Sequence, residues 1–164
     1  MVCLLLGGGG LPARAQVSAA AREIELQFRN GDPRAALLRL DQAMAARPGD
    51  AGLRFLQGVL LAESGRSAEA VAVFERMNED FPDLPEPYNN LAVIEAAKGQ
   101  LDRARSLLET ALRLDSAYRT AHENLGDVLV RLALRAYEAA ANGPSAEPAL
   151  KTKLRMVREL AAGS

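Results

Sequence analysis

Apolar residues recur at helical spacing along most of the chain, in segments of about 14 residues that end at a glycine or a proline-containing turn. One segment places its apolar residues on a single helix face: Ala104, Leu107, Leu108, Ala111 and Leu112. Aromatic residues make up only 4% of the chain, whereas Ala, Leu and Arg dominate, which favours closely packed helices over strands. The pattern therefore predicts an all-α fold of helical hairpins.

This pattern repeats every 34 residues. Three sets of residues keep the register: the glycines Gly31, Gly65 and Gly99, the alanines Ala36, Ala70 and Ala104, and the bulky residues Leu40, Phe74 and Leu108. A glycine such as Gly99 can end the first helix of a pair with positive φ, which a side chain would oppose. We expect each alanine to let the two helices approach closely, with the bulky residue filling the space beside it.

The repeat resembles the tetratricopeptide unit, which has small residues at its eighth and twentieth positions and a glycine at its fifteenth. Gly58, Ala92 and Gly126 occupy the eighth position here, and Tyr88 occupies the fourth, where the family prefers an aromatic residue. The resemblance implies a small bacterial exported family member that forms a right-handed superhelical solenoid of antiparallel helix pairs. Its expected units are a degenerate first unit and two regular ones, then a partial fourth: 17–50, 51–84, 85–118 and 119–142.

The register is lost in the fourth unit. Ala133 replaces the turn glycine and Glu138 replaces the alanine, so a continuous helix from Thr120 to about Asn142 and a hairpin both remain open. The segment Gly143-Pro144-Ser145 predicts the end of that element, and residues 146–161 predict a further helix with one apolar face: Leu150, Leu154, Val157 and Leu160. We expect this helix to cap the solenoid. Its Lys and Arg residues permit an alternative contact with a partner or a membrane surface.

The N-terminal residues 1–15 resemble a signal peptide, with an apolar run from Val2 to Leu6 and a small-residue cleavage site after Ala15. This reading predicts a periplasmic or secreted protein. The alternative is a disordered glycine-rich leader, which would leave the protein in the cytoplasm. After residue 16 no segment approaches the ~18 consecutive apolar residues of a membrane span.

Charge and residue types restrict the chemistry. The formal net charge is −1, which disfavours nucleic acid as a partner, and the single cysteine, Cys3, rules out an internal disulfide. His122 is expected to pack between helices, and the carboxylates around the second turn between units are expected to be solvated charges: Glu79, Asp80, Asp83 and Glu86. We therefore expect no enzyme activity, no cofactor and no metal site.

The resemblance places the partner-binding surface on the first helix of each unit, which lines the concave wall of the superhelix. Its groove positions are occupied by Phe55, Val59, Glu63, Asn89, Asn90, Val93, Ala97, Glu123, Asn124, Asp127 and Arg131. Asn90 and Asn124 share the sixth position, and an amide offers both a donor and an acceptor to a peptide backbone. Glu123 and Asp127 predict a partner segment that is neutral or basic at that point.

Together these features predict a non-catalytic scaffold that binds a protein or peptide segment in its groove, with a role in assembling envelope complexes. The alternative function is a self-associating structural module, a homo-oligomer with no peptide ligand.

Overall fold

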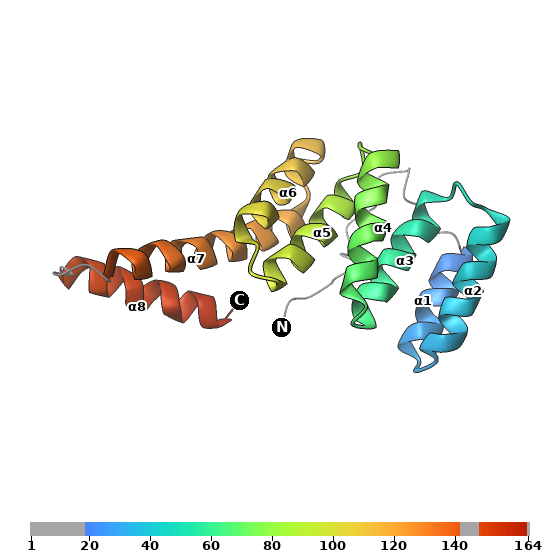
Figure 1. Ribbon diagram of the computed structural model, residues 1–164, viewed down its shortest axis with the longest axis horizontal. Coiled ribbons are helices and arrows are strands. Elements are labelled where there is room, and N and C mark those ends of the chain that lie inside the picture. Colours follow the sequence, from blue (N-terminus) through green and yellow to red (C-terminus); the bar gives the residue numbers. More distant parts are fainter. Residues whose placement is uncertain (1–18, 142–147, 164) are drawn as a thin grey trace.

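The computed structural model describes residues 19–141 and 148–163. Within these ranges the chain forms eight helices and no strands: α1 (Ala19–Arg29), α2 (Pro33–Ala46), α3 (Ala51–Glu63), α4 (Ser67–Asp80), α5 (Pro85–Ala97), α6 (Leu101–Leu114), α7 (Arg119–Ala141) and α8 (Pro148–Gly163). Figure 1 shows three stacked antiparallel pairs, α1–α2, α3–α4 and α5–α6, followed by a hairpin of α7 and α8. The all-α helical-repeat solenoid is confirmed, whereas the predicted leader 1–15 and the Gly143-Pro144-Ser145 turn lie outside the described residues.

The turn inside each of the three pairs depends on a glycine with a left-handed backbone. Gly31, Gly65 and Gly99 have φ of 93°, 75° and 80°, as the spacing predicts. The carboxylates of Asp32 and Asp50 then accept backbone N–H groups in the first turns of α2 and α3. The hairpins are therefore fixed locally, before any contact between pairs.

A small residue opposite a large one sets the distance between paired helices. Ala70 and Phe74 on α4 have no exposed surface, and the Phe74 ring lies against Gly58 on α3. A Cβ atom added to Gly58 would lie 2.5 Å from a carbon of this ring, closer than any carbon contact allows. The small residue at this eighth position, Gly58, therefore lets α3 approach α4 closely.

The stack curves with the first helices on its inner side. Among the described residues, the backbones of α1 and α3, of α3 and α5, and of α5 and α7 approach one another, whereas those of α2 and α4 and of α4 and α6 do not. Since the first helices lie closer together than the second helices, they line the inner wall of the stack. Each successive pair therefore adds one helix to the same inner surface.

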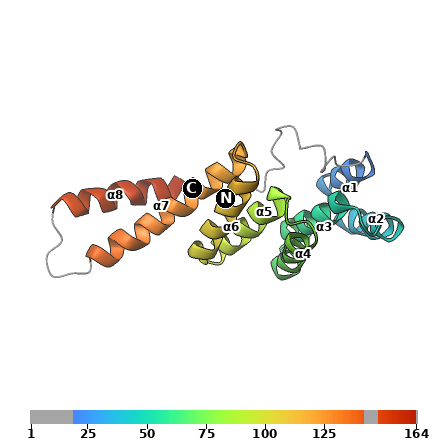
Figure 2. The same ribbon diagram turned by 90° about the horizontal axis from the view of Figure 1, so that it is seen from above.

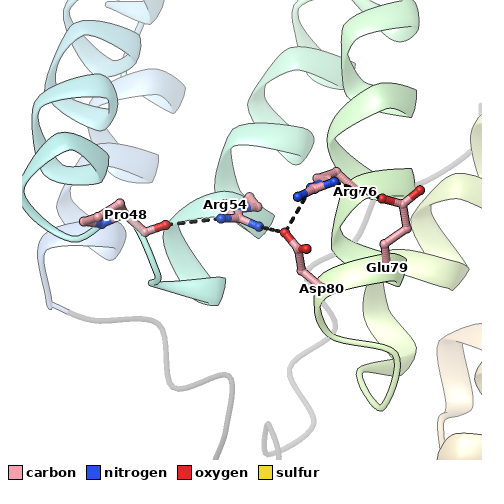
Figure 3. A network of polar contacts seen from close by, with 5 residues as sticks. All are labelled: Pro48, Arg54, Arg76, Glu79 and Asp80. Atoms are coloured by element: carbon pink, nitrogen blue, oxygen red, sulfur yellow. Dashed lines mark hydrogen bonds and ion pairs between the residues drawn. The ribbon is translucent and has the colours of Figure 1, made fainter.

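Arg54 occupies the fourth position of the second unit, where the third unit has Tyr88, and it joins several neighbouring residues (Figure 3). Its guanidinium donates to the Asp80 carboxylate and, over 3.2 Å, to the carbonyl oxygen of Pro48. The same carboxylate also forms an ion pair with Nε of Arg76 at 3.2 Å. The guanidinium also lies 5.5 Å from the centre of the Phe81 ring, within range of a cation–π contact. Arg54 thus ties the start of α3 to the turn that precedes the second unit and to the end of α4.

The fourth unit is one continuous helix, which decides between the two alternatives left open by its sequence. α7 runs straight through Ala133, where the other units turn at a glycine. α8 packs along α7 and, among the described helices, along no other, and Arg158 pairs with Glu138 at 3.0 Å. On the predicted apolar face of α8, Leu154 is buried and Leu160 is 61% exposed. α8 therefore covers α7 rather than the whole end of the stack.

The two glycines at the eighth position should respond oppositely to alanine. Gly58→Ala should lower the free energy of unfolding by about 1–3 kcal/mol, because the buried Phe74 ring has no room to retreat. Gly126→Ala, where nothing lies within 4 Å of the added Cβ, should raise it by about 0.5–1 kcal/mol through the gain in helix propensity. Urea unfolding of both variants measures the difference, and equal effects would contradict the packing described for α3 and α4.

Candidate protein-binding site

A cavity of about 250 Å³ lies between α5, α6, α7 and the C-terminal end of α8. We call it the α5–α7 cavity. Its lining is Ala92, Val93, Ala96, Leu108, Asn124, Asp127, Val128, Arg131, Leu134 and Ala161. Figure 2 shows how α8 runs back along α7 towards the stacked pairs, which places Ala161 beside the inner wall. Apolar side chains thus form most of the surface, and three polar side chains from α7 face the same space.

One polar residue of the lining, Asn124, forms a hydrogen bond with a second amide, that of Asn89, which lies outside the lining. Nδ2 of Asn124 donates to Oδ1 of Asn89 over 2.8 Å, which joins α7 to α5. Asn90, by contrast, is 9% exposed and donates to the backbone oxygen of Glu86 one turn earlier in its own helix. The structure therefore engages Asn124 with Asn89 and leaves Asn90 outside the cavity. The oxygen of the Asn124 amide is still free to accept a hydrogen bond.

Three charged side chains on α7 carry no internal ion pair. Glu123 and Asp127 are exposed and Arg131 is half-buried, and none of them forms an ion pair or hydrogen bond with another described residue. The spacing of Asp127 and Arg131 would permit an internal pair, as Glu25 and Arg29 show at 2.9 Å on α1. All three charges are therefore available to a partner.

The apolar residues predicted for the groove fall into three places: the cavity lining, the core of the second unit and the exposed end of α5. Val93 is 7% exposed and lines the cavity. Val59 is buried in the core of the second unit, and Phe55 packs there too, with its ring centre 5.9 Å from that of Phe74. Ala97 is exposed at the end of α5. Phe55 and Val59 therefore position α3, whereas Val93 belongs to the surface that a ligand could reach.

Glu63 lies at the end of α3, where charges from α1 approach it. Burial raises the pKa of its carboxyl, Arg29 lowers this pKa and Glu25 raises it. This second group of charges on the inner wall lies in the first two units, away from the α5–α7 cavity.

The prediction of solvated turn carboxylates is wrong for Glu86. Its side chain is 8% exposed, and one of its carboxylate oxygens, Oε2, is buried with no hydrogen-bond partner. Burial raises the pKa of Glu86, a hydrogen bond from its own backbone N–H partly offsets this rise, and the nearby charge of Asp115 adds to it. Burial also raises the pKa of Tyr118, together with the charges of Glu86 and Asp115. The start of α5 is packed beneath the turn between α6 and α7, which the sequence pattern alone does not reveal.

His122 also differs from its prediction. Its side chain is exposed at the start of α7, and Nε2 lies 3.0 Å from the carbonyl oxygen of Ser116. In the regular units a second helix folds back over the first, but α7 continues without a turn, so the His122 ring is not packed between helices. Among the described residues, no three His, Cys, Asp or Glu side chains gather in a way that could hold a metal ion.

Six cavity residues are not among the predicted groove residues: Ala92, Ala96, Leu108, Val128, Leu134 and Ala161. Leu134 follows the point where the repeat register is lost, and Ala161 belongs to the helix expected to cap the solenoid or, alternatively, to contact a partner or a membrane through its basic residues. Neither carries a sequence signal for a binding site, because both enter the cavity through the packing of α8 on α7.

Known proteins share this arrangement of helix pairs. The tetratricopeptide repeat family matches residues 27–94 and again residues 61–125, which together span more than half of the chain. The chain belongs to this family, whose repeats form protein-interaction scaffolds and are generally non-catalytic. In the part that the structure describes, no helix is both long and apolar enough to span a membrane.

Two individual proteins are similar to the chain. Tetratricopeptide repeat domain-containing protein PYG7, chloroplastic, of Arabidopsis thaliana is 29% identical over 91% of the chain, which spans only 50% of that relative. The solved structure of the MamA RS-1 ArsTM double mutant is 17% identical, and the match covers 94% of this chain and 100% of that one with a TM-score of 0.38.

Glu86 should give the protein a measurable pH dependence. A folded-state pKa raised by burial means that stability falls as the pH rises from the unfolded value near 4.5 through the folded value. Glu86→Gln should therefore raise the free energy of unfolding by on the order of 1 kcal/mol at neutral pH, and this gain should vanish below the unfolded pKa. Urea unfolding across this pH range tests it, with the exposed Glu123→Gln as the control. A loss of stability in Glu86→Gln at neutral pH would contradict the unpaired burial of this carboxylate.

Proposed function

We propose that the protein is a non-catalytic scaffold that binds an extended segment of a partner protein along the inner wall formed by α1, α3, α5 and α7. The observation that carries the proposal is the α5–α7 cavity, which brings together four of the residues expected in the groove: Val93, Asn124, Asp127 and Arg131. They come from the first helices of successive units, so a segment bound in the space between α5 and α7 would contact both helices.

The chemistry of this surface suits an extended peptide. The oxygen of Asn124 can accept a backbone N–H, and Arg131 can donate to a carbonyl or a carboxylate. The apolar lining can hold a side chain that leaves water on binding. An assembly role outside the cytoplasm belongs to the same proposal, and it rests on the signal-like residues 1–15.

Site-specific photocrosslinking tests the proposed surface. A benzophenone amino acid in place of Asp127 should form covalent adducts with a protein partner in cells, because this position borders the cavity. The same amino acid in place of Ser106, an exposed residue of the second helix α6, is the matched control. Immunoblotting of the tagged protein measures the adducts. Equal adduct patterns at both positions, or none at Asp127, would contradict binding along the inner wall.

Leu26 supports self-association as a second candidate function. Its equivalents at the 34-residue spacing, Leu60, Ile94 and Val128, are 0%, 6% and 3% exposed because each packs against the preceding pair. Leu26 itself is 59% exposed on α1, the first described helix. An apolar side chain at a stacking position suits contact with another copy of the chain.

If the protein self-associates, the average mass of the purified protein should rise with its concentration. The Leu26→Gln variant should keep the monomer mass, because a polar amide would be costly to bury in the contact. Multi-angle light scattering over a wide concentration range measures both proteins. Leu38→Gln, another leucine that is 59% exposed but lies on α2, is the control and should not change the association. A wild-type mass that stays monomeric throughout would exclude this function.

A further inference from the structure

We propose that the α5–α7 cavity is a specificity pocket that takes one large apolar side chain of the bound segment. The segment also carries a basic residue two positions to one side of this anchor and an acidic residue two positions to the other. This inference rests on the proposed scaffold function and names the chemistry of the segment that the scaffold binds.

The lining of the pocket selects the anchor. Seven of its ten residues are apolar, from Ala92 on α5 to Ala161 on α8, and its volume of about 250 Å³ leaves room for a leucine, methionine or phenylalanine side chain. An apolar group that enters such a space gains by leaving water, whereas a charged group would lose its hydration without a buried counter-charge. The site therefore favours a large aliphatic or aromatic anchor.

The charges beside the pocket select the flanking residues. Glu123, Asp127 and Arg131 are spaced by four residues on one side of α7, so each step along the helix is about 6 Å. Alternate side chains of an extended segment project from the same face about 7 Å apart. Glu123 and Arg131 are about 12 Å apart along the helix, close to the about 14 Å between the residues two positions either side of the anchor. A segment lying alongside α7 can therefore place a basic residue near Glu123 and within reach of Asp127, the anchor in the pocket and an acidic residue near Arg131.

Asp127 and Arg131 form no ion pair with each other, and this supports their assignment to peptide recognition. Had Asp127 and Arg131 formed an ion pair with each other, a ligand would first have to break it, but neither has a partner among the described residues. The two acids beside the pocket also disfavour a polyanion such as nucleic acid, which would meet them with like charge. A protein segment of mixed charge is the occupant that satisfies all three side chains.

Selection from a random library of 12-residue peptides displayed on phage, with the purified full-length chain as the target, provides the probe. The enriched peptides should share one large apolar residue, with Lys or Arg two positions to one side and Asp or Glu two positions to the other. Their affinities for the wild-type chain and its variants can then be compared by fluorescence anisotropy. Failure to enrich any binding peptide would overturn both the scaffold function and this inference.

Ala161→Trp fills the pocket from the end of α8 without changing the stacked pairs. The selected peptides should bind this variant about tenfold or more weakly, since the anchor loses its place. Ala162→Trp adds the same side chain to the neighbouring exposed residue, which does not line the pocket, and should bind like the wild type. Peptides that bind Ala161→Trp and the wild type equally would overturn the pocket while leaving the scaffold function intact.

Asp127→Lys tests the flanking charge separately. A second selection on this variant should enrich an acidic residue at the position that was basic, because the charge facing it has been reversed. A general loss of folding would not produce this exchange of preference, and circular dichroism of each variant identifies any that fail to fold. An unchanged preference for a basic residue in well-folded Asp127→Lys would overturn the assignment of this charge to recognition.

Discussion

The close approach of α3 and α4 in the second helix pair is the constraint on which the rest of the structure depends. At Gly58 and Phe74 the distance is so short that the first helix has no room for a side chain. The turn glycines fix each hairpin locally, and this contact fixes the width of the α3–α4 pair, against which the α1–α2 and α5–α6 pairs stack. Regular stacking in turn aligns the first helices along one inner wall.

The candidate site arises where this regular pattern ends. α7 lacks the turn glycine, so no second helix folds back over Gly126, whose surroundings are open. α8 packs along α7 instead, and its last turn brings Ala161 to the cavity beside α5. A regular fourth unit would have placed a helix over the face of α7 that carries Gly126. The departure from the repeat therefore shapes the surface that distinguishes this chain from a uniform solenoid.

Features that depend on local spacing could be predicted from the sequence, and features that depend on helix placement could not. The turn at Gly99 and the packing at Ala70 follow from the 34-residue period, because each involves only one hairpin. Asn89 and Asn90 are adjacent, and only the position of α7 relative to α5 determines that Asn124 meets Asn89. The burial of Glu86 likewise depends on how the turn before α7 lies over the start of α5.

The polar residues around the cavity divide into two groups with different consequences for stability. On α5, Asn89 is buried and bonded to α7, so changing it would disturb the contact between the two helices as well as any ligand. On α7, Asp127 is exposed and Arg131 half-buried, and an internal pair between such residues would add only about 0.2–0.5 kcal/mol. Leaving them unpaired therefore costs the fold little. Substitutions on α7 would therefore change the charge of this surface while α5 keeps the stack intact.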